Sequence, residues 1–234
     1  MHLPDGIINN QIAAGLMAVS AGFLAGSFYK LRQALTEKVF VAKKQLAVAD
    51  GPSVELGTGQ KSILTKTGKE KIELMIMLGS LVFVFQLIDF PILNFGIGHL
   101  LGGALLALVL GPWAGIVIMS LILIIQSLVL ADGGIMALGA NFLNIGLVTV
   151  VSSHLFYKLG LKLKFPQLGV LFVACLASVV LASLFYVLTV GVAGINHLTE
   201  VFNGMVKAHF IIGVFESLVT IIIIKTLKLK MYLQ

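Results

Sequence analysis

The chain has 234 residues, of which 59% are hydrophobic and only 11% are charged, and its mean hydropathy is +1.07. So few charges cannot cover the surface of a soluble domain, and the composition therefore predicts a membrane protein. The net charge of +6 does not indicate nucleic-acid binding, because the basic residues lie between apolar runs, and the single cysteine, Cys175, excludes a disulfide framework and a cysteine metal cluster.

The first ten residues, MHLPDGIINN, lack the basic segment of a signal peptide and carry the acidic Asp5 instead. We therefore expect the mature chain to begin at Met1. The run LPDGI is a turn signal, because proline fixes φ, aspartate bonds its own backbone and glycine permits a positive φ. Such a turn would direct Met1 and His2 back into the protein, so residues 1–10 are predicted to form a metal-binding loop.

Seven apolar segments follow, each a candidate for a transmembrane helix of about 20 residues. Only Gly111 and Pro112 separate the third from the fourth, but one helix over both would reach about 48 Å and overshoot the hydrocarbon core. Two short helices fit better. The sequence thus predicts an all-α, polytopic membrane protein that forms a single membrane domain over residues 1–234. The segments are 11–29, 72–88, 98–110, 113–131, 136–157, 167–190 and 207–226.

Residues 30–71 form the longest polar segment and are predicted to be a cytoplasmic loop. Within 30–48 one stripe is apolar while Lys and Arg lie elsewhere, which predicts an interfacial helix. Residues 50–70 have the Gly, Ser, Thr and Lys content of a solvated linker, with a docking segment as the alternative. The apolar stripe consists of Leu31, Leu35, Val39, Ala42 and Leu46.

The distribution of Lys and Arg supports seven spans, because short cytoplasmic loops carry an excess of both. With the N-terminus outside and the C-terminus in the cytoplasm, fifteen of the sixteen basic residues lie on the inner side, and only Lys207 lies outside. Six spans would place Lys158, Lys162 and Lys164 on the wrong face. We therefore expect a multi-pass protein of a prokaryotic cytoplasmic membrane.

Small residues recur every four positions in the first segment, at Ala14, Ala18, Gly22 and Gly26. Small residues on one helical face let backbones approach closely in lipid, so this face is predicted to pack inside the bundle. The third segment carries similar spacings, Gly98 with Gly102 and Gly103 with Ala107 and Gly111.

Polar residues inside membrane segments are costly and often functional. Under the seven-span topology most of them lie toward the outer helix ends, which predicts a polar pocket that opens outward. Glu216 is the one clearly deep acidic residue. It lies seven positions after His209 on the same helical face, which leaves open an acid/base pair of an intramembrane hydrolase or a helix-packing or gating hydrogen bond. The outer polar residues are Gln86, His99, Gln126, Asn141, Asn144 and His209.

His2 is the most specific chemical feature of the sequence. A free terminal amine, the next backbone amide and the imidazole of the second residue can chelate one ion through three nitrogens in fused five- and six-membered rings. Planar nitrogen-rich coordination suits Ni(II) and Cu(II) better than hard ions such as Mg(II). A fourth nitrogen would complete the square, and His99, flanked by glycines at the outer start of the third segment, is the best candidate. A surface histidine is the alternative interpretation of His2.

Four segments resemble the metal-capturing S component of energy-coupling factor transporters for nickel and cobalt, the NikM and CbiM family. They are MHLPDG at the N-terminus, GHLLGGALLALVLGPWAG at 98–115, LADGGIMALGANFLNIG at 130–146 and HFIIGVFE at 209–216. The resemblance covers most of the chain. It implies seven spans, with an additional N-terminal helix that lets the terminus enter the core.

The resemblance also implies that Ni(II) or Co(II) is the transported substrate, bound by the amine of Met1, the amide and imidazole of His2, and His99. Asn141 and Asn144 match the A-N-x-x-N positions and are expected to orient these ligands through hydrogen bonds, with helix packing as the alternative. The implied partners are a transmembrane coupling subunit, two cytoplasmic ATPase subunits and a small accessory membrane protein. No phosphate-binding loop motif occurs in this chain, so its energy is expected to come from such a partner.

The competing function is an S component for an organic vitamin, which would need a larger pocket lined by aromatic residues. The only tryptophan, Trp113, starts a segment at the predicted inner side, which weakens that alternative. His154 and His197 are predicted to be surface histidines. The choice between nickel and cobalt stays open, with a slight preference for nickel that rests on the resemblance of the terminus alone.

Overall fold

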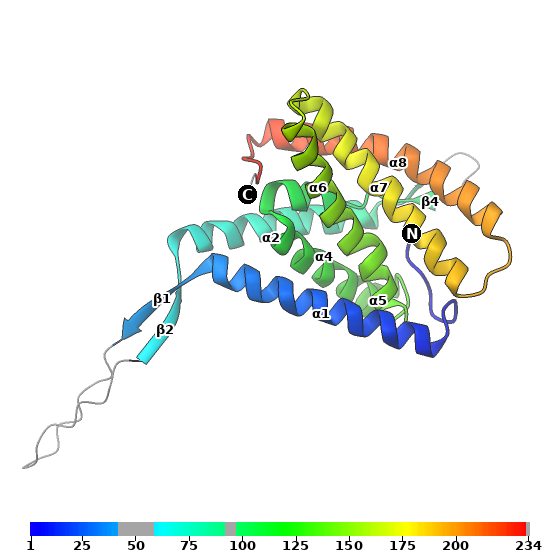
Figure 1. Cartoon of the computed structure of the whole chain (residues 1–234), viewed down its shortest axis with the longest axis horizontal. Coiled ribbons are helices and arrows are strands. Elements are labelled where there is room, and N and C mark those ends of the chain that lie inside the picture. The colour runs from blue at the N-terminus through cyan, green and yellow to red at the C-terminus, as the bar shows by residue number, and fades with distance from the viewer. Residues whose placement is uncertain (42–58, 92–96, 233–234) are drawn as a thin grey trace, which may run out of the picture.

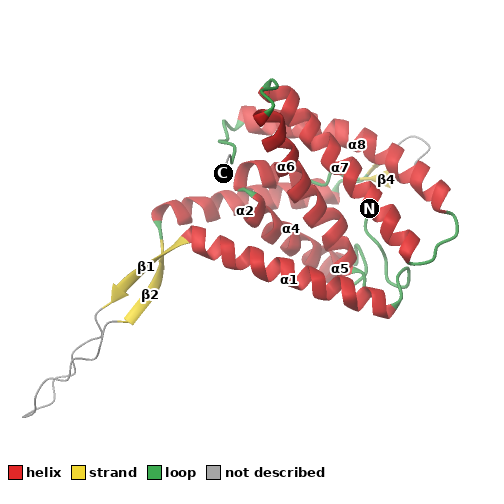
Figure 2. Cartoon of the chain, in the orientation of Figure 1, coloured by secondary structure: helices red, strands yellow, loops and turns green. Residues whose placement is uncertain are grey.

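Seven helical segments run back and forth through one bundle in the computed structural model, which describes residues 1–41, 59–91 and 97–232 (Figures 1 and 2). Each of the seven predicted segments overlaps one of them. The helical segments are α1 (Asn10–Leu35), α2 (Lys66–Leu87), α3 (Gly103–Leu110), α4 (Pro112–Ile125) continued by the π-helical η2 (Gln126–Leu130), α5 (Leu138–Asn141) continued by the π-helical η3 (Phe142–Leu147) and by α6 (Val148–Lys162), α7 (Gln167–Val192) and α8 (Leu198–Thr226).

Five of these segments are long and apolar enough to cross a membrane, among the described residues. They are α1, α4 with η2, α5 through α6, α7 and α8. The remaining two segments, α2 and α3, do not meet this requirement, each for its own reason. The first turns of α2 are rich in Lys and Glu, and α3 has 8 residues, which give a length of only about 12 Å. The protein is thus a mostly helical membrane protein, and the full count of seven spans stays a prediction.

The predicted helix over 98–110 is wrong at its start. Residues Ile97–Gly98 form strand β4, which pairs antiparallel with β3 (Phe90–Pro91), and the helix begins only at Gly103. Gly102 has a φ of 76°, which glycine adopts without strain. A continuous helix would therefore be interrupted here, and an extended segment of residues 99–102 enters the bundle ahead of α3.

The predicted interfacial helix over 30–48 is also wrong in part. α1 continues to Leu35, and residues Thr36–Val41 then form strand β1. The run TEKVFV is rich in β-branched and aromatic residues, which favour a strand over a helix. Positions 42–48 of the predicted helix lie outside the described residues.

The predicted linker over 50–70 is structured in its second half. Gly59–Leu64 form β2, which pairs antiparallel with β1, and α2 begins at Lys66. Thr65 joins the two helices, because its N–H donates to the carbonyl of Leu35 over 3.1 Å and its hydroxyl accepts from the N–H of Gly68 over 2.9 Å. The hairpin of β1 and β2 therefore lies directly between the end of α1 and the start of α2. Positions 50–58 lie outside the described residues.

The small-residue stripe of α1 does not pack inside the bundle, contrary to the prediction. Ala14, Ala18, Gly22 and Gly26 are exposed, and α1 buries a different face, formed by Ala13, Ser20, Ser27 and Leu31. The buried face is held by a hydrogen bond, because the Ser20 hydroxyl donates to the carbonyl of Gly139 over 2.8 Å. Residue size alone could not distinguish these two faces.

Helix α3 forms the centre of the bundle, since all of its residues are buried. Its first residue allows the closest approach: a Cβ on Gly103 would overlap the Thr149 hydroxyl of α6. The predicted close packing at Gly103 is therefore confirmed. The other end of α3 is covered by the C-terminal tail, whose Tyr232 N–H donates to the carbonyl of Leu108 over 2.6 Å.

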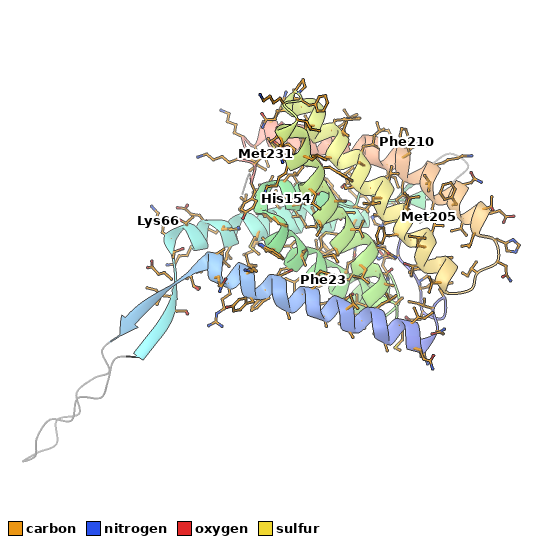
Figure 3. All side chains as sticks on the ribbon, in the orientation of Figure 1. Phe23, Lys66, His154, Met205, Phe210 and Met231 are labelled. Atoms are coloured by element: carbon orange, nitrogen blue, oxygen red, sulfur yellow. The ribbon has the colours of Figure 1, made fainter. Side chains whose placement is uncertain are left out.

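Lys66 and Lys71, in the first turns of α2, lie at the end of the bundle where α3 meets Tyr232. Lys71 near the start of α2 lies over the Tyr232 ring, 5.2 Å from its centroid. Figure 3 shows Lys66 and Met231 at this end and Met205 at the opposite one. His154 also lies here, but it is buried and its ring is 6.0 Å from that of Tyr232, so its prediction as a surface residue is wrong. His197 is exposed, as predicted.

Replacing Gly103 by alanine is expected to destabilise the protein by about 1–3 kcal/mol, because the added methyl group has no space against Thr149. The matched control is Gly22→Ala, where nothing lies within 4 Å of the added atom. Thermal unfolding in detergent measures both. A Gly103→Ala protein that unfolds at the same temperature as the Gly22→Ala protein would contradict the packing described.

Candidate functional site

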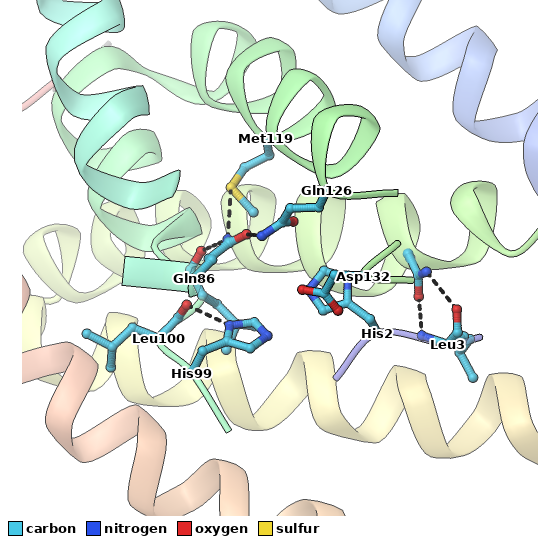
Figure 4. Close-up of polar contacts among 10 residues, drawn as sticks. His2, Leu3, Gln86, His99, Leu100, Met119, Gln126 and Asp132 are labelled. Carbon is cyan, nitrogen blue, oxygen red and sulfur yellow. Dashed lines mark hydrogen bonds and ion pairs between the residues drawn. The ribbon is translucent and has the colours of Figure 1, made fainter. Parts of the chain in front are cut away.

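The N-terminal segment is docked inside the protein. The side chain of Leu3 is fully buried, and Asn141 binds both polar groups of its backbone: the Leu3 N–H donates to Oδ1 over 2.7 Å, and Nδ2 donates to the Leu3 carbonyl over 3.0 Å (Figure 4). The N–H of Gly134 donates to the same carbonyl over 2.9 Å. Asn141 therefore holds the N-terminal segment by the backbone of Leu3, the residue next to His2. We call this pair of hydrogen bonds the Asn141 clamp.

Asp5 fastens the segment a second time, but not by bonding its own turn as the sequence predicts. Its carboxylate accepts the N–H groups of Ile135, Met136 and Ala137 over 2.8 to 3.1 Å. These amides precede α5, so Asp5 satisfies a helix N-terminus from another part of the chain. A Cβ on Gly134 would overlap the Asp5 carboxylate, which explains the glycine there.

Docking brings together the two histidines that the sequence analysis singles out. The ring centroids of His2 and His99 are 5.1 Å apart, and the ring planes are inclined by 38°. The Nε2 atoms of both rings are buried without a hydrogen-bond partner among the described residues. The Nδ1 atom of His99 lies 3.0 Å from the carbonyl of Leu100, which favours the tautomer with the proton on Nδ1 and a free lone pair on Nε2. His99 is therefore prepared to bind a cation.

The extended segment that carries His99 is held by Glu216. The carboxylate accepts the N–H of Leu101 over 2.7 Å and the N–H of Gly102 over 3.0 Å. His209, on the same helix, places its Nδ1 2.8 Å from the carbonyl of Met205. Both oxygens of Glu216 are thus already engaged by the backbone, and the carboxylate serves to anchor the His99 segment. This use does not favour a hydrolytic pair with His209.

A glutamine pair completes the support of the same segment. The Nε2 of Gln86 donates to the carbonyl of Leu101 over 2.5 Å, and the Nε2 of Gln126 donates to Oε1 of Gln86 over 2.9 Å. Gln86 lies in the last turn of α2 and Gln126 begins η2, so α2 and the helix formed by α4 and η2 meet at the site. Asn144 does not join this group, because its Oδ1 accepts from the Thr189 hydroxyl of α7 over 3.2 Å.

The environment favours the neutral forms of the terminal groups, which lie outside the membrane-spanning helices. Burial lowers the pKa of the Met1 amine below its usual 8.0, although the charges of Asp132 and Asp89 oppose the shift. Burial, followed by the positive charges of the amine and of His99, lowers the pKa of His2 from 6.5 to about 2. A neutral amine and a neutral imidazole are the forms that bind metal ions.

The arrangement offers nitrogen ligands rather than a cluster of acidic side chains or thiols. No group of three or more His, Cys, Asp or Glu side chains that could hold a metal ion occurs in the described part of the chain. The convergent groups are two imidazoles, the first amine and the adjacent backbone. Sequence reasoning selected His2 and His99 but missed Asp132, whose Oδ2 is 3.8 Å from Nε2 of His2. The sequence feature that could have indicated Asp132 is the motif D-G-G, which directly follows an apolar run.

Comparison with known proteins gives a consistent result. Residues 45–231 match a family model described as the cobalt uptake substrate-specific transmembrane region. The chain is 29% identical over 193 residues to a putative fused nickel transport protein of Archaeoglobus fulgidus, which covers 82% of this chain and 53% of that protein. It therefore spans about half the length of that relative. A cobalt transport protein of Acetohalobium arabaticum is 34% identical over 117 residues, which cover 50% of this chain and 47% of that protein.

Solved structures share the fold. The crystal structure of a truncated transition metal transporter superposes with a TM-score of 0.76 and 23% sequence identity, covering 97% of this chain and 98% of that one. A second transition metal transporter structure gives the same TM-score and identity and covers 92% of that chain.

Replacing Asn141 by alanine is expected to release the N-terminal segment, because the Leu3 N–H loses its acceptor and the Leu3 carbonyl loses one of two donors. Each unsatisfied buried group costs about 1–3 kcal/mol. Labelling of the terminal amine by an acylating reagent should become faster than in the unchanged protein. Asn144→Ala is the matched control, since Asn144 bonds Thr189 instead. Equal labelling rates in the two variants would rule out the clamp.

Proposed function

The chain belongs to the family of cobalt uptake substrate-specific transmembrane proteins, and on that premise we propose that it is the substrate-specific component of an energy-coupling factor importer for Ni(II) or Co(II). Its relatives are named as nickel and cobalt transport proteins, so the chain is a membrane component of cobalt or nickel transport. The capture of the ion from the outside and its ATP-driven import by partner subunits are the finer parts of the proposal.

The observation that carries the proposal is the meeting of His2 and His99 beside a buried terminal amine. The ion is proposed to bind the amine of Met1, the backbone amide and imidazole of His2, and Nε2 of His99. Four nitrogens favour a planar site, which suits Ni(II) and Cu(II) among the divalent metals, and of these two the relative in Archaeoglobus fulgidus is named for nickel. Asn141 would support the site by holding Leu3, whereas Asn144, which bonds α7, is placed better for helix packing.

The proposed partners are a transmembrane coupling subunit, two cytoplasmic ATPase subunits and a small accessory membrane protein. Support comes from the family and from the absence of a phosphate-binding loop motif in the sequence. The Lys residues at the start of α2 lie at the end where the C-terminal tail returns, which supports an orientation with that end and the C-terminus in the cytoplasm, and with the N-terminus outside. The membrane would be the cytoplasmic membrane of a prokaryote.

Two alternatives are less well supported. A vitamin-binding S component would need the N-terminal segment to leave room for an organic ligand, but the His2 ring lies beside His99, with the ring centroids 5.1 Å apart. A hydrolase would need Glu216 to be available, but its carboxylate binds two backbone amides. X-ray fluorescence of the purified protein would identify the bound ion and decide between nickel and cobalt.

A single residue added before Met1 is expected to abolish metal uptake while the protein still folds in the membrane. The added residue converts the amine into an amide and moves the new terminus by about 3.5 Å. His2→Ala and His99→Ala should each remove most of the affinity in calorimetry. His197→Ala is the matched control, because this imidazole is exposed. Unchanged binding in the extended protein, or in both of the histidine variants, would place the site elsewhere.

Metal affinity is expected to rise between pH 5 and pH 8. The lowered pKa values of the docked amine and of His2 mean that the released segment binds more protons than the docked one. Docking is therefore favoured fully above the ordinary values of 8.0 and 6.5 and becomes weaker as the pH falls below them. Deprotonation of the His2 amide on binding adds to the same trend. Calorimetric titrations across this range measure it, and a flat response would contradict the ligand set.

A further inference from the structure

Asp132 lies beside His2 at the rim of the site. Its Oδ2 is 3.8 Å from Nε2 of His2, and its side chain is 41% exposed, whereas that of His2 is 6% exposed (Figure 4). The backbone of Asp132 is fixed, because its N–H donates to the carbonyl of Gln126 over 3.0 Å and the preceding Ala131 adopts a left-handed conformation with a φ of 55°. The carboxylate is thus close to the ring but beyond hydrogen-bond distance, so a hydrogen bond with Nε2 needs a rotation of the Asp132 side chain.

The chemistry of the proposed chelate assigns different tasks to the two nitrogens of His2. Only Nδ1 can close a six-membered ring with the amide nitrogen of the same residue, because Nε2 is on the far side of the imidazole. The Nε2 atom is then left to carry the proton. It is buried and has no hydrogen-bond partner among the described residues, and Asp132 is the carboxylate it approaches. Metal-binding histidines commonly donate their second N–H to a carboxylate, which fixes the tautomer and the ring orientation.

The net charge of the proposed metal complex also points to Asp132. A divalent ion bound by a deprotonated amide, a neutral amine and two neutral imidazoles leaves one net positive charge inside an apolar bundle. An uncompensated buried charge is costly. The single negative charge of Asp132 would balance it, and the exposed position of the carboxylate means that little desolvation is needed before the ion arrives.

We propose that Asp132 is a positioning residue of the metal site, which accepts a hydrogen bond from the Nε2–H of His2, leaves Nδ1 free for the ion and neutralises the charge of the complex. This inference rests on the proposed function for its metal-bound part. Its metal-free part, the selection of the His2 tautomer by Asp132, does not.

The test compares Asp132→Ala and Asp132→Asn with Asp89→Asn. Asp89 is the matched control, since it is an exposed carboxylate near the same amine. Calorimetry with NiCl2 and CoCl2 on the full chain in detergent should give an affinity about 10–100-fold lower in both Asp132 variants, and an affinity close to that of the unchanged protein in Asp89→Asn. Thermal unfolding of the metal-free proteins should be unchanged, because the carboxylate is not part of the packed core.

A second measurement detects a role that mere structural support would not produce. Nitrogen NMR of ring-labelled histidine in the metal-free protein should show the proton of His2 on Nε2, and Asp132→Ala should shift the population toward the other tautomer. Affinities equal to that of Asp89→Asn together with an unchanged tautomer would overturn the role of Asp132. If the unchanged protein itself binds neither ion, the proposed function fails, and the tautomer measurement still decides whether Asp132 directs His2.

Discussion

The structure depends on one constraint: backbone N–H and C=O groups that leave a helix inside an apolar bundle must find partners within the protein. Two non-helical segments enter this bundle, and each carries one of the two site histidines. The segment after Met1 is satisfied by Asn141, and the segment before α3 is satisfied by Glu216 and Gln86. These polar residues therefore make it possible to bury the ring nitrogens of His2 and His99 inside the bundle.

Much of the helical arrangement could be predicted from hydropathy, because a bilayer requires long apolar segments and the sequence interrupts them clearly. The site histidines could be selected because an imidazole at the second position has a specific chemistry. Other predictions failed where tertiary contacts decide. The stripe from Ala14 to Gly26 is apolar and small but faces outward, whereas the opposing face of α1 is buried and its Ser20 bonds the carbonyl of Gly139. His154 is likewise buried near Tyr232 of the returning C-terminal tail, a contact that the local sequence does not encode.

The roles of the buried polar residues were harder to predict, because their partners are backbone atoms far away in the sequence. Asp5 binds amides 130 to 132 positions later, and Glu216 binds amides more than 110 positions earlier. No periodicity or motif spacing encodes such pairs. Glu216 could be recognised as unusual for its depth, but its use as an anchor for Leu101 and Gly102 follows only from the three-dimensional arrangement.

The two segments that carry His2 and His99 are attached to different parts of the bundle. The first is fastened to α5 and to the residues that precede it, and the second to α2 and α8. An ion held by both rings would act as a cross-link between these two groups of helices. Binding of the ion would stabilise the folded bundle. The melting temperature would then rise with the logarithm of the ion concentration. Release of the ion would in turn remove this link between the two groups of helices.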